Sequence, residues 1–329
     1  MMLASRQLRL LIGRCSLATP STRTLTSASA SDEKSRSVLI SQSHDIFSNL
    51  ALEDWLYRHL DVSTRDVLFI WSNDPCVVIG RHQNPWTEAN FRFLRDRNIP
   101  LARRNSGGGT VYHDRGNLCL TFFSAREDYD REGNLGMVAE AVKDAFGIDL
   151  AVNQRQDIEV LGKKVSGTAA KLASKKAYHH CTLLVNADRE NLRAALDNKE
   201  SKSCISSTAT ASVPSPIANL SDFFLPGLTV PDVISVVGDS FLARGTPLGQ
   251  DKMGYQFVRP DPFWYSGIDQ IRAEFASWDW IYGRTPDFKY EKAFHVPDIG
   301  DIQVNMKGCG AGTGGATDFS RSWSQIRSN

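Results

Sequence analysis

The sequence predicts an α+β fold, and three observations carry that prediction. Apolar residues between 49 and 60 recur at helical intervals among charged ones, which is typical of an amphipathic helix. Two short runs rich in β-branched and aromatic residues follow at 66–71 and 76–80, separated by turn-forming residues. Helical and strand patterns then continue without a regular βαβ period, which favours α+β architecture.

The other elements follow in chain order. Helical pattern is present at 86–98, 137–146 and 232–243, and strand pattern at 99–104, 118–123 and 182–185. Residues 157–167 are expected to form a hairpin, and 169–173 begin a segment of small residues. The polar, Ser- and Thr-rich stretch 198–216 is expected to be a loop that leads into a short helical pattern at 217–220.

The composition excludes several classes of protein. The 38 basic and 37 acidic residues leave a formal net charge of +1, so no global field attracts nucleic acid or a membrane surface. No apolar stretch approaches the roughly 20 residues of a transmembrane helix, so we expect a soluble protein. The six cysteines show neither CxxC pairing nor the density of a disulfide scaffold, and we expect reduced thiols.

The two ends of the chain differ in character from its middle. Residues 1–31 contain four arginines, many Ser and Thr, and no acidic residue, which is typical of a mitochondrial transit peptide and predicts a matrix protein. A basic, disordered N-terminus without an address is the alternative. Residues 305–329 include a glycine-rich run and few apolar residues, so we expect a disordered tail.

A glycine-rich segment combines features that suit an anion. Residues 103–114 are RRNSGGGTVYHD, and successive glycines let backbone N–H groups converge without Cβ obstruction. The adjacent Arg103 and Arg104 add planar donors that match phosphate, so the segment predicts a phosphate cradle. Its spacing is neither that of a P-loop nor GxGxxG. A flexible hairpin is the competing interpretation, which the arginine pair disfavours.

A lysine in the predicted hairpin is a second candidate. Lys164 begins the segment KVSGTA, where its ammonium can lie against a phosphate and a developing oxyanion. Taken alone this signal is weak, because an isolated lysine is usually a solvated surface residue.

Paired histidines at 179–180 raise the question of a metal or a covalent site. Neighbours in a strand point to opposite faces and no third ligand has zinc spacing, so we expect structural histidines and no metal. A covalent route through Cys181 or Cys119 is disfavoured, because Cys181 and the adjacent histidine would also point apart.

These segments, together with residues 71–86, resemble the lipoate-protein ligase A family. The resemblance covers roughly residues 38–300, is strongest for mitochondrial lipoyltransferases (lipoyl amidotransferases), and rests on the motifs GRHQNPW, RRNSGGGTVYHD, KVSGTA, AYHHCTLL and STATAS. Several motifs in a fixed order discriminate far better than any one of them.

The resemblance implies a large mixed-sheet catalytic domain of the biotin/lipoate-protein ligase type at 32–280. It also implies a C-terminal accessory domain that is truncated or replaced, with a remnant at 281–304. In that family the RRxSGGG loop closes over an acyl-adenylate, and the lysine of KVSG bridges the acyl carbonyl and the phosphate. Lys164 is therefore the expected catalytic residue.

The same resemblance implies which residues bind lipoyl-AMP. The expected contacts are Arg104 on the adenylate, Lys164 at the carbonyl, and the lining residues Gly109, Thr110, Val111 and Tyr112. Further candidates for this pocket are Arg155, Thr168, Thr182 and Thr210. We expect His82, Gln83 and Asn84 to position the loop or the acyl tunnel.

The implied function is amide transfer, in which an acceptor lysine attacks the lipoyl carbonyl. The expected donor is lipoyl-AMP or lipoylated glycine-cleavage H protein, and the expected acceptors are lipoyl domains in E2 subunits of 2-oxoacid dehydrogenases. The proton acceptor stays open between the leaving phosphate, Asp157 and water. We expect a monomer with no tightly bound cofactor.

Three alternatives remain open. The first is an ATP-dependent lipoate ligase, which needs Mg²⁺, although no acidic cluster is evident near the glycine loop. The second is a catalytically idle protein that binds lipoyl domains. The third is a nucleotide-binding regulatory module.

Overall fold

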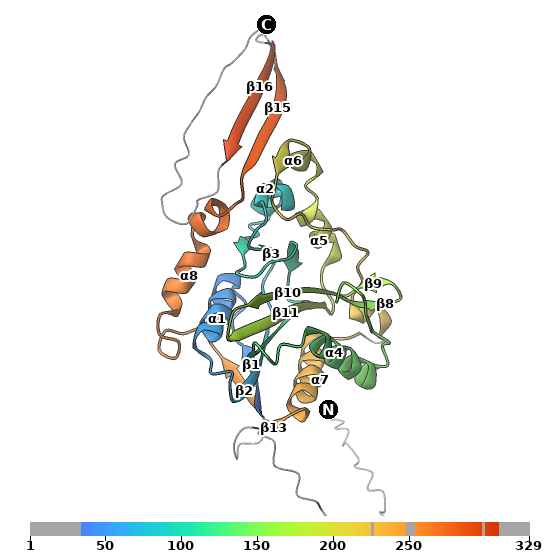
Figure 1. The fold of residues 1–329 in the computed structure, drawn as a ribbon. Helices are drawn as coiled ribbons and strands as arrows, with labels where there is room; N and C mark the ends of the chain where they lie inside the picture. Colours follow the sequence, from blue (N-terminus) through green and yellow to red (C-terminus); the bar gives the residue numbers. More distant parts are fainter. Residues whose placement is uncertain (1–33, 225–226, 248–253, 298–299, 309–329) are drawn as a thin grey trace, which may run out of the picture. The chain divides into compact units, whose positions relative to one another are not determined.

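The structure is a computed structural model that describes residues 34–224, 227–247, 254–297 and 300–308. A seven-stranded mixed sheet forms its centre, in the order β10-β11-β6-β2-β1-β13 with β14 also paired to β1 (Figure 1). Its strands are β1 Ser35–Ser41, β2 Arg65–Trp71, β6 Asn117–Ala125, β10 Ser166–Leu172, β11 Lys176–Leu184, β13 Thr246–Pro247 and β14 Tyr255–Val258. The expected α+β class with a mixed sheet is confirmed.

Helices cover both faces of this sheet, which explains why its central strands are nearly continuous in apolar residues. Helices α1 (Ile46–His59) and α8 (Ile268–Ala276) share one core cluster with alternate side chains of β2, such as Phe69. Helices α4 (Arg131–Phe146) and α7 (Val230–Ala243) share the other cluster with the intervening side chains, such as Leu68. The side-chain alternation of each strand therefore divides the core into two layers.

Local signals define the ends of the long helices. The Asp45 carboxylate accepts a hydrogen bond from the backbone N–H of Ser48 and caps α1. Asp130 caps α4 in the same way, and Gly147 ends α4 in the left-handed conformation at a φ of 69°. Both N-caps are aspartates, a residue type that is strongly preferred at helix N-termini.

The described residues also form three small sheets. The first holds β3 Cys76–Ile79, β4 Leu101–Arg103 and β5 Val111–His113; the second holds β7 Ala151–Val152, β8 Ile158–Val160 and β9 Lys163–Lys164; the third holds β12 Ile205–Ser207, β15 Phe288–Val296 and β16 Gly300–Gly308. The short helices are α2 Pro85–Glu88, α3 Phe91–Asp96, α5 Arg189–Leu196, α6 Lys199–Ser203, η1 Leu220–Phe223 and η2 Asp279–Gly283.

Some expected elements differ from the structure. The single helix expected at 86–98 is two short helices, because Asn90 accepts a hydrogen bond from Phe93 N and starts α3 anew. The expected loop at 198–216 contains α6 and β12, and the helical pattern at 217–220 becomes the 3-10 helix η1, which starts only at Leu220.

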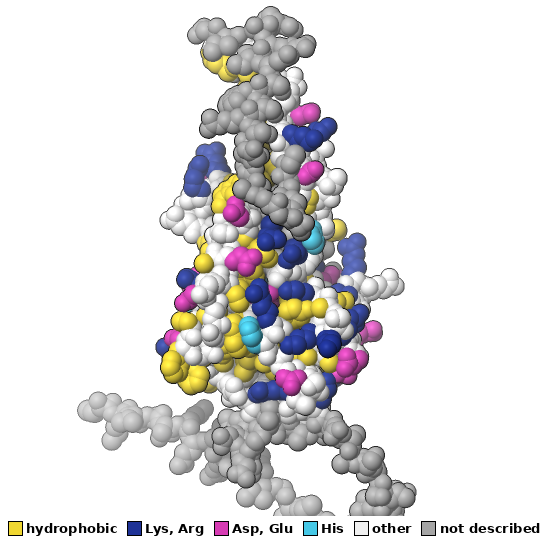
Figure 2. Space-filling model, turned by 60° about the vertical axis from the view of Figure 1, so that its left-hand side comes forward, with side chains coloured by type: hydrophobic (Ala, Val, Ile, Leu, Met, Phe, Trp, Pro, Cys, Tyr) yellow, Lys and Arg dark blue, Asp and Glu magenta, His cyan; other side chains and the backbone are white. Residues whose placement is uncertain are grey.

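The expected tail boundary was wrong, because β16 continues to Gly308 through pairing with β15. The rest of the expected tail and the expected transit peptide lie outside the described residues. Among the described residues, no helix combines the length and apolarity that crossing a membrane requires. The described cysteines Cys76, Cys119, Cys181 and Cys204 are free thiols. On the face shown in Figure 2, basic side chains are interspersed with acidic and apolar ones.

Candidate active site

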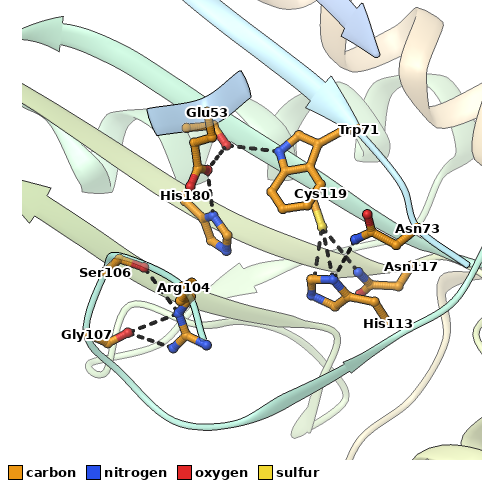
Figure 3. A network of polar contacts seen from close by, with 11 residues as sticks. Glu53, Trp71, Asn73, Arg104, Ser106, Gly107, His113, Asn117, Cys119 and His180 are labelled. Atoms are coloured by element: carbon orange, nitrogen blue, oxygen red, sulfur yellow. Dashed lines mark hydrogen bonds and ion pairs between the residues drawn. The ribbon is translucent and has the colours of Figure 1, made fainter. Parts of the chain in front are cut away.

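The glycine loop, residues 104–110, connects β4 to β5, and Arg104 holds its shape. This guanidinium curls back onto the loop (Figure 3), where Nη2 donates to the carbonyls of Gly107 at 2.6 Å and Gly109 at 2.7 Å. Nε donates to Ser106 Oγ at 3.1 Å, and Nη1 to Val78 O at 3.2 Å. Burial lowers the pKa of Arg104 to about 10, so the side chain stays charged at neutral pH. Apart from the bond to Val78 in β3, its donors bind the loop itself.

Two glycines are required for this packing. Gly108 has a φ of +87°, and an added Cβ would lie 3.0 Å from Arg104 Nη2. An added Cβ on Gly80 would overlap the carbonyl oxygen of Gly108. The loop therefore lies directly on the end of β3, and only glycine allows the approach.

Arg103 points away from the glycine loop and is fully buried. Its guanidinium donates to the carbonyls of Arg81 at 2.9 Å and Gln83 at 2.8 Å on one side. On the other side it donates to Ile281 O at 2.6 Å and Thr285 Oγ1 at 3.0 Å. Arg103 thus ties the C-terminal part of the chain to the segment that supports the loop. Arg103 is therefore engaged by backbone carbonyls outside the glycine loop, whereas Arg104 lies at the loop and its contact with an adenylate stays a prediction.

A polar cluster closes the other end of the loop. The backbone N–H of Thr110 donates to Ser212 Oγ at 2.8 Å, and Thr110 Oγ1 lies 2.9 Å from Gln83 Oε1. Ser212 and Thr110 both donate to the carboxylate of Glu88, which is 4% exposed. The backbone N–H of Thr210 donates to His82 O at 3.1 Å. These contacts agree with the positioning role expected for the His82–Gln83 segment.

Lys164 lies in the hairpin of β8 and β9. Its Nζ is 3.0 Å from Asp157 Oδ2, and the two side chains are 27% and 12% exposed. The backbone of Lys164 is held by residues 216–218: its N–H donates to Pro216 O at 2.9 Å, and its carbonyl accepts from Ala218 N at 3.1 Å. The ammonium is thus partly buried and already paired with a carboxylate.

The start of β10 connects this hairpin to the glycine loop. Gly167 donates its backbone N–H to Thr182 Oγ1 at 3.0 Å, and an added Cβ there would lie 3.8 Å from Val111 Cγ1. Val111 and Thr182 therefore both lie against Gly167, in the strand that Lys164 precedes along the chain. Thr168 pairs in register with Cys181, whose side chain belongs to the core on the other face. The side chain of Thr168 consequently points away from Thr182.

Two other expected residues are not brought to this group. Tyr112 is buried in the core, and its hydroxyl has no hydrogen-bond partner among the described residues. Together with Asp114 and Asp188 it lines a cavity of about 470 Å³ that contains neither Lys164 nor a residue of the glycine loop. Arg155 is exposed in the turn before β8, where its backbone N–H donates to Asn153 Oδ1 at 2.9 Å.

Buried histidines support the sheet beneath the loop. His180 Nδ1 lies 3.0 Å from Glu53 Oε1, which also accepts from Thr121 Oγ1 at 2.7 Å (Figure 3). His113 accepts from Asn73 Nδ2 at 2.8 Å, and burial lowers its pKa to about 3, which keeps it neutral. The expected structural roles of these side chains agree with the contacts. Within the described ranges, no group of three His, Cys, Asp or Glu side chains is placed to hold a metal ion.

The cysteines are placed poorly for covalent chemistry. Cys119 Sγ lies 3.8 Å from His113 Nδ1, but both are fully buried. Burial raises the pKa of Cys119 well above its ordinary value and the pKa of Cys181 to about 12. Neither thiol is therefore a thiolate at neutral pH, and nucleophilic catalysis requires the thiolate.

Glu88 and the buried role of Arg103 were missed in the sequence. Glu88 follows Asn84, whose Oδ1 accepts from Trp86 N at 3.0 Å, so an acidic residue in the first turn of a capped helix was a usable signal. That signal predicts a helix start but not which hydroxyl groups the carboxylate will meet.

Sequence comparisons identify relatives of this chain. A model of the lipoyl protein ligase A/B catalytic domain matches residues 45–242. Human mitochondrial lipoyl amidotransferase LIPT1 is 42% identical over 262 residues, which span 79% of this chain and 68% of the human protein.

Solved structures share the fold at lower identity. LipL1 of P. falciparum, solved in complex with lipoate, has a TM-score of 0.64 and 23% identity, and the match covers 83% of this chain and 85% of that one. A bi-partite lipoate protein ligase from Thermoplasma acidophilum, described with its E2 lipoyl domain, has a TM-score of 0.58 and 22% identity, over 76% of this chain and 97% of that one. The expectation of a lipoyltransferase enzyme is confirmed by the human relative and the matched domain together.

The chain belongs to the lipoyl protein ligase A/B catalytic domain family.

Proposed function

We propose that this chain moves a lipoyl group from lipoyl-AMP to a lysine amine of a lipoyl domain, with Lys164 as the catalytic residue. The observation that carries the proposal is that β10, the strand that begins two residues after Lys164, lies against the glycine loop: an added Cβ on Gly108 would be 3.5 Å from Thr168 O, and one on Gly167 would be 3.8 Å from Val111 Cγ1. A phosphate-bearing acyl donor lying along that strand would have a cation at one end and the loop at the other.

The reaction is an acyl substitution. The neutral amine of the acceptor lysine attacks the lipoyl carbonyl, the C–N bond forms, and the bond from the carbonyl carbon to the phosphate oxygen breaks as AMP leaves. Lys164 stabilises the negative charge on the carbonyl oxygen and on the departing phosphate, a type of contact that contributes ~3 to 4 kcal/mol. Its positive charge also favours attack by the deprotonated acceptor amine.

Asp157 Oδ2 lies 3.0 Å from the Lys164 ammonium. A carboxylate at this distance attracts the ammonium and limits its rotamers. The amine proton then leaves through the AMP phosphate, Asp157 or water, and Asp157 is the group among these whose position is fixed by the fold.

The biological donor and acceptor are proposed from the relatives. The archaeal ligase is described with its E2 lipoyl domain, so we assign lipoyl domains of E2 subunits as acceptors here. Lipoylated glycine-cleavage H protein is the second donor that we consider. The human relative is mitochondrial, and we assign this chain to the matrix, with residues 1–31 as its transit peptide and 281–304 as part of an accessory domain.

The test is mass spectrometry of an apo lipoyl domain after incubation with the purified chain and lipoyl-AMP. We expect a lipoyl mass increase on one lysine. Lys164→Ala should lower the transfer rate by about 10² to 10³, the size reported for loss of one such donor. Lys163→Ala is the matched control, because Lys163 is the exposed neighbour in the same strand.

The alternatives give different results in the same assay. An idle binding protein would retain lipoyl-AMP binding without any mass increase, and an ATP-dependent ligase would modify the domain when supplied with lipoate, ATP and Mg²⁺ alone. Equal transfer rates for the Lys164→Ala and Lys163→Ala variants would show that Lys164 is not the catalytic residue.

A further inference from the structure

Glu88 is a buried carboxylate at the end of α2. Its hydrogen-bond donors are neutral groups of Thr110, at the end of the glycine loop, and of Ser212. Thr110 Oγ1 lies 3.1 Å from Glu88 Oε2, the Ser212 hydroxyl donates to the same oxygen, and Ser212 N lies 3.3 Å from Oε1. Only 4% of Glu88 is exposed, so its carboxylate loses much of its hydration. Strong hydrogen bonds must compensate for that loss.

The hydrogen bonds around Gln83 fix the direction of its side-chain amide. Oε1 accepts from the backbone N–H of Gly80 at 2.8 Å, and Nε2 donates to Thr210 O at 3.3 Å. Because one partner is only a donor and the other only an acceptor, the amide has a single satisfactory orientation. Its Nε2 then donates to Ser212 Oγ at 3.0 Å.

The direction of the Ser212 hydroxyl follows from these contacts. Ser212 Oγ receives N–H bonds from both Gln83 Nε2 and Thr110 N, so its own proton can only go to Glu88. Thr110 Oγ1 has two acceptors nearby, Gln83 Oε1 and Glu88 Oε2, and its proton is shared between them. Without the carboxylate, the Ser212 hydroxyl loses the acceptor that orients it, and the Thr110 hydroxyl keeps only Gln83 Oε1.

We propose that Glu88 is a positioning residue. It fixes the 210–212 segment against Thr110 and so shapes the part of the proposed lipoyl-AMP site that lies beside Thr110. This inference rests on the proposed function for the identity of the ligand. Glu88 acts through Ser212 and Thr110 and does not touch the substrate. Its removal should therefore weaken lipoyl-AMP binding far more than it slows the transfer step.

Glu88→Gln tests the proposal with little change in volume. The new amide keeps only one acceptor oxygen, so its NH2 donor must face either the backbone N–H of Ser212 or the hydroxyls of Ser212 and Thr110. We expect the Kd for lipoyl-AMP, measured by calorimetry, to rise by about tenfold to a hundredfold, as for loss of a hydrogen bond to a charged group. The rate of transfer at saturating lipoyl-AMP should stay within about threefold.

Two further variants make the test specific. Ser212→Ala should raise the Kd by a similar factor, and Glu88→Gln should add little in the Ser212→Ala background, since Glu88 acts through that hydroxyl. Glu190→Gln is the matched control, because Glu190 is an exposed acid in the first turn of α5. Thermal unfolding of each variant reports whether it folds, and if Glu88→Gln does not, the Ser212→Ala result decides.

The outcomes separate this proposal from the proposed function. An unchanged Kd in both Glu88→Gln and Ser212→Ala overturns the positioning role, as does a loss of saturated rate with an unchanged Kd. If the unaltered chain binds lipoyl-AMP but transfers nothing, the proposed function fails, while the ratio of Kd values still decides the role of Glu88.

Discussion

The glycine loop and the hairpin that carries Lys164 border the site that we propose, but the fold holds them differently. The loop is fixed at both ends, by the buried guanidinium of Arg104 and by the hydroxyl of Ser212. The Lys164 side chain is 27% exposed, and its ammonium is paired with the carboxylate of Asp157. The glycine loop is therefore a pre-formed binding surface, whereas the Lys164 ammonium retains some conformational freedom.

This difference suits the proposed chemistry. Donors that are already oriented need no reorganisation when charge develops, which is the main source of electrostatic catalysis. A lysine that stabilises both the acyl carbonyl oxygen and the departing phosphate oxygen must instead move as the distance between these two oxygens changes. The largest effects of substitution on stability should therefore lie on the loop side, and the smallest on the hairpin side.

The largest effect is expected at Arg103, whose guanidinium binds carbonyls on both the loop support and the C-terminal segment. Arg103→Met should lower the free energy of unfolding by about 3 to 5 kcal/mol, because it leaves several buried carbonyls without a donor. Denaturant unfolding measures this. Arg95→Met is the control, since that side chain is 77% exposed, and equal losses for the two variants would refute the anchoring role.

A smaller loss is expected from Gly80→Ala. The added Cβ overlaps the carbonyl oxygen of Gly108, which is backbone and cannot rotate away, so the loop must shift. We expect a loss of about 1 to 3 kcal/mol in unfolding free energy and weaker lipoyl-AMP binding. Gly107→Ala is the matched control within the loop, where an added Cβ meets no atom within 4 Å. The comparison breaks down if both variants bind lipoyl-AMP equally well.

On the hairpin side, Asp157→Asn should change activity and leave stability nearly intact. The amide still fills the space but no longer attracts the Lys164 ammonium, so we expect about a tenfold slower transfer, with the Kd for lipoyl-AMP within about threefold. Glu159→Gln provides a control in the same hairpin, where the glutamate accepts from Asn153. A large fall in thermal stability for Asp157→Asn would contradict the contrast with the loop.

Acid should weaken the sheet beneath the loop. Burial lowers the pKa of His113 and of His179 to about 3, from the ordinary value of 6.5. Between these values the unfolded chain binds protons that the folded chain does not, so the free energy of unfolding falls as the pH drops below about 6.5. Each histidine contributes up to about 1.4 kcal/mol per pH unit to that slope.

His179→Phe measures one of these contributions. The ring nitrogens of His179 have no hydrogen-bond partner among the described residues, and the ring stacks on Phe122 with centroids 5.8 Å apart. The variant should be at least as stable at pH 7 and should lose less stability between pH 6.5 and pH 5. Chemical unfolding at several pH values tests this, and parallel slopes for the two proteins would exclude His179 as a source.

Much of the fold was accessible from the sequence because it depends on local pattern. The runs at 66–71 and 118–123 are buried strands of the central sheet, and the hairpin around Lys164 is present as β8 and β9. The glycine loop was located to the residue. These features follow from side-chain period, turn residues and the conformational freedom of glycine, all of which act over a few neighbouring residues.

The partners of the polar side chains required the tertiary structure. Arg103 and Arg104 are adjacent and identical in type, yet one binds carbonyls 177 and 178 residues away and the other binds its own loop. Likewise, the strand register alone decides that Thr182 faces Gly167 while Thr168 faces the opposite core. By itself the sequence determined the elements and the chemistry available. Only packing between distant segments decided which donors meet which acceptors, because a buried polar group must be satisfied by whatever the fold brings within about 3 Å.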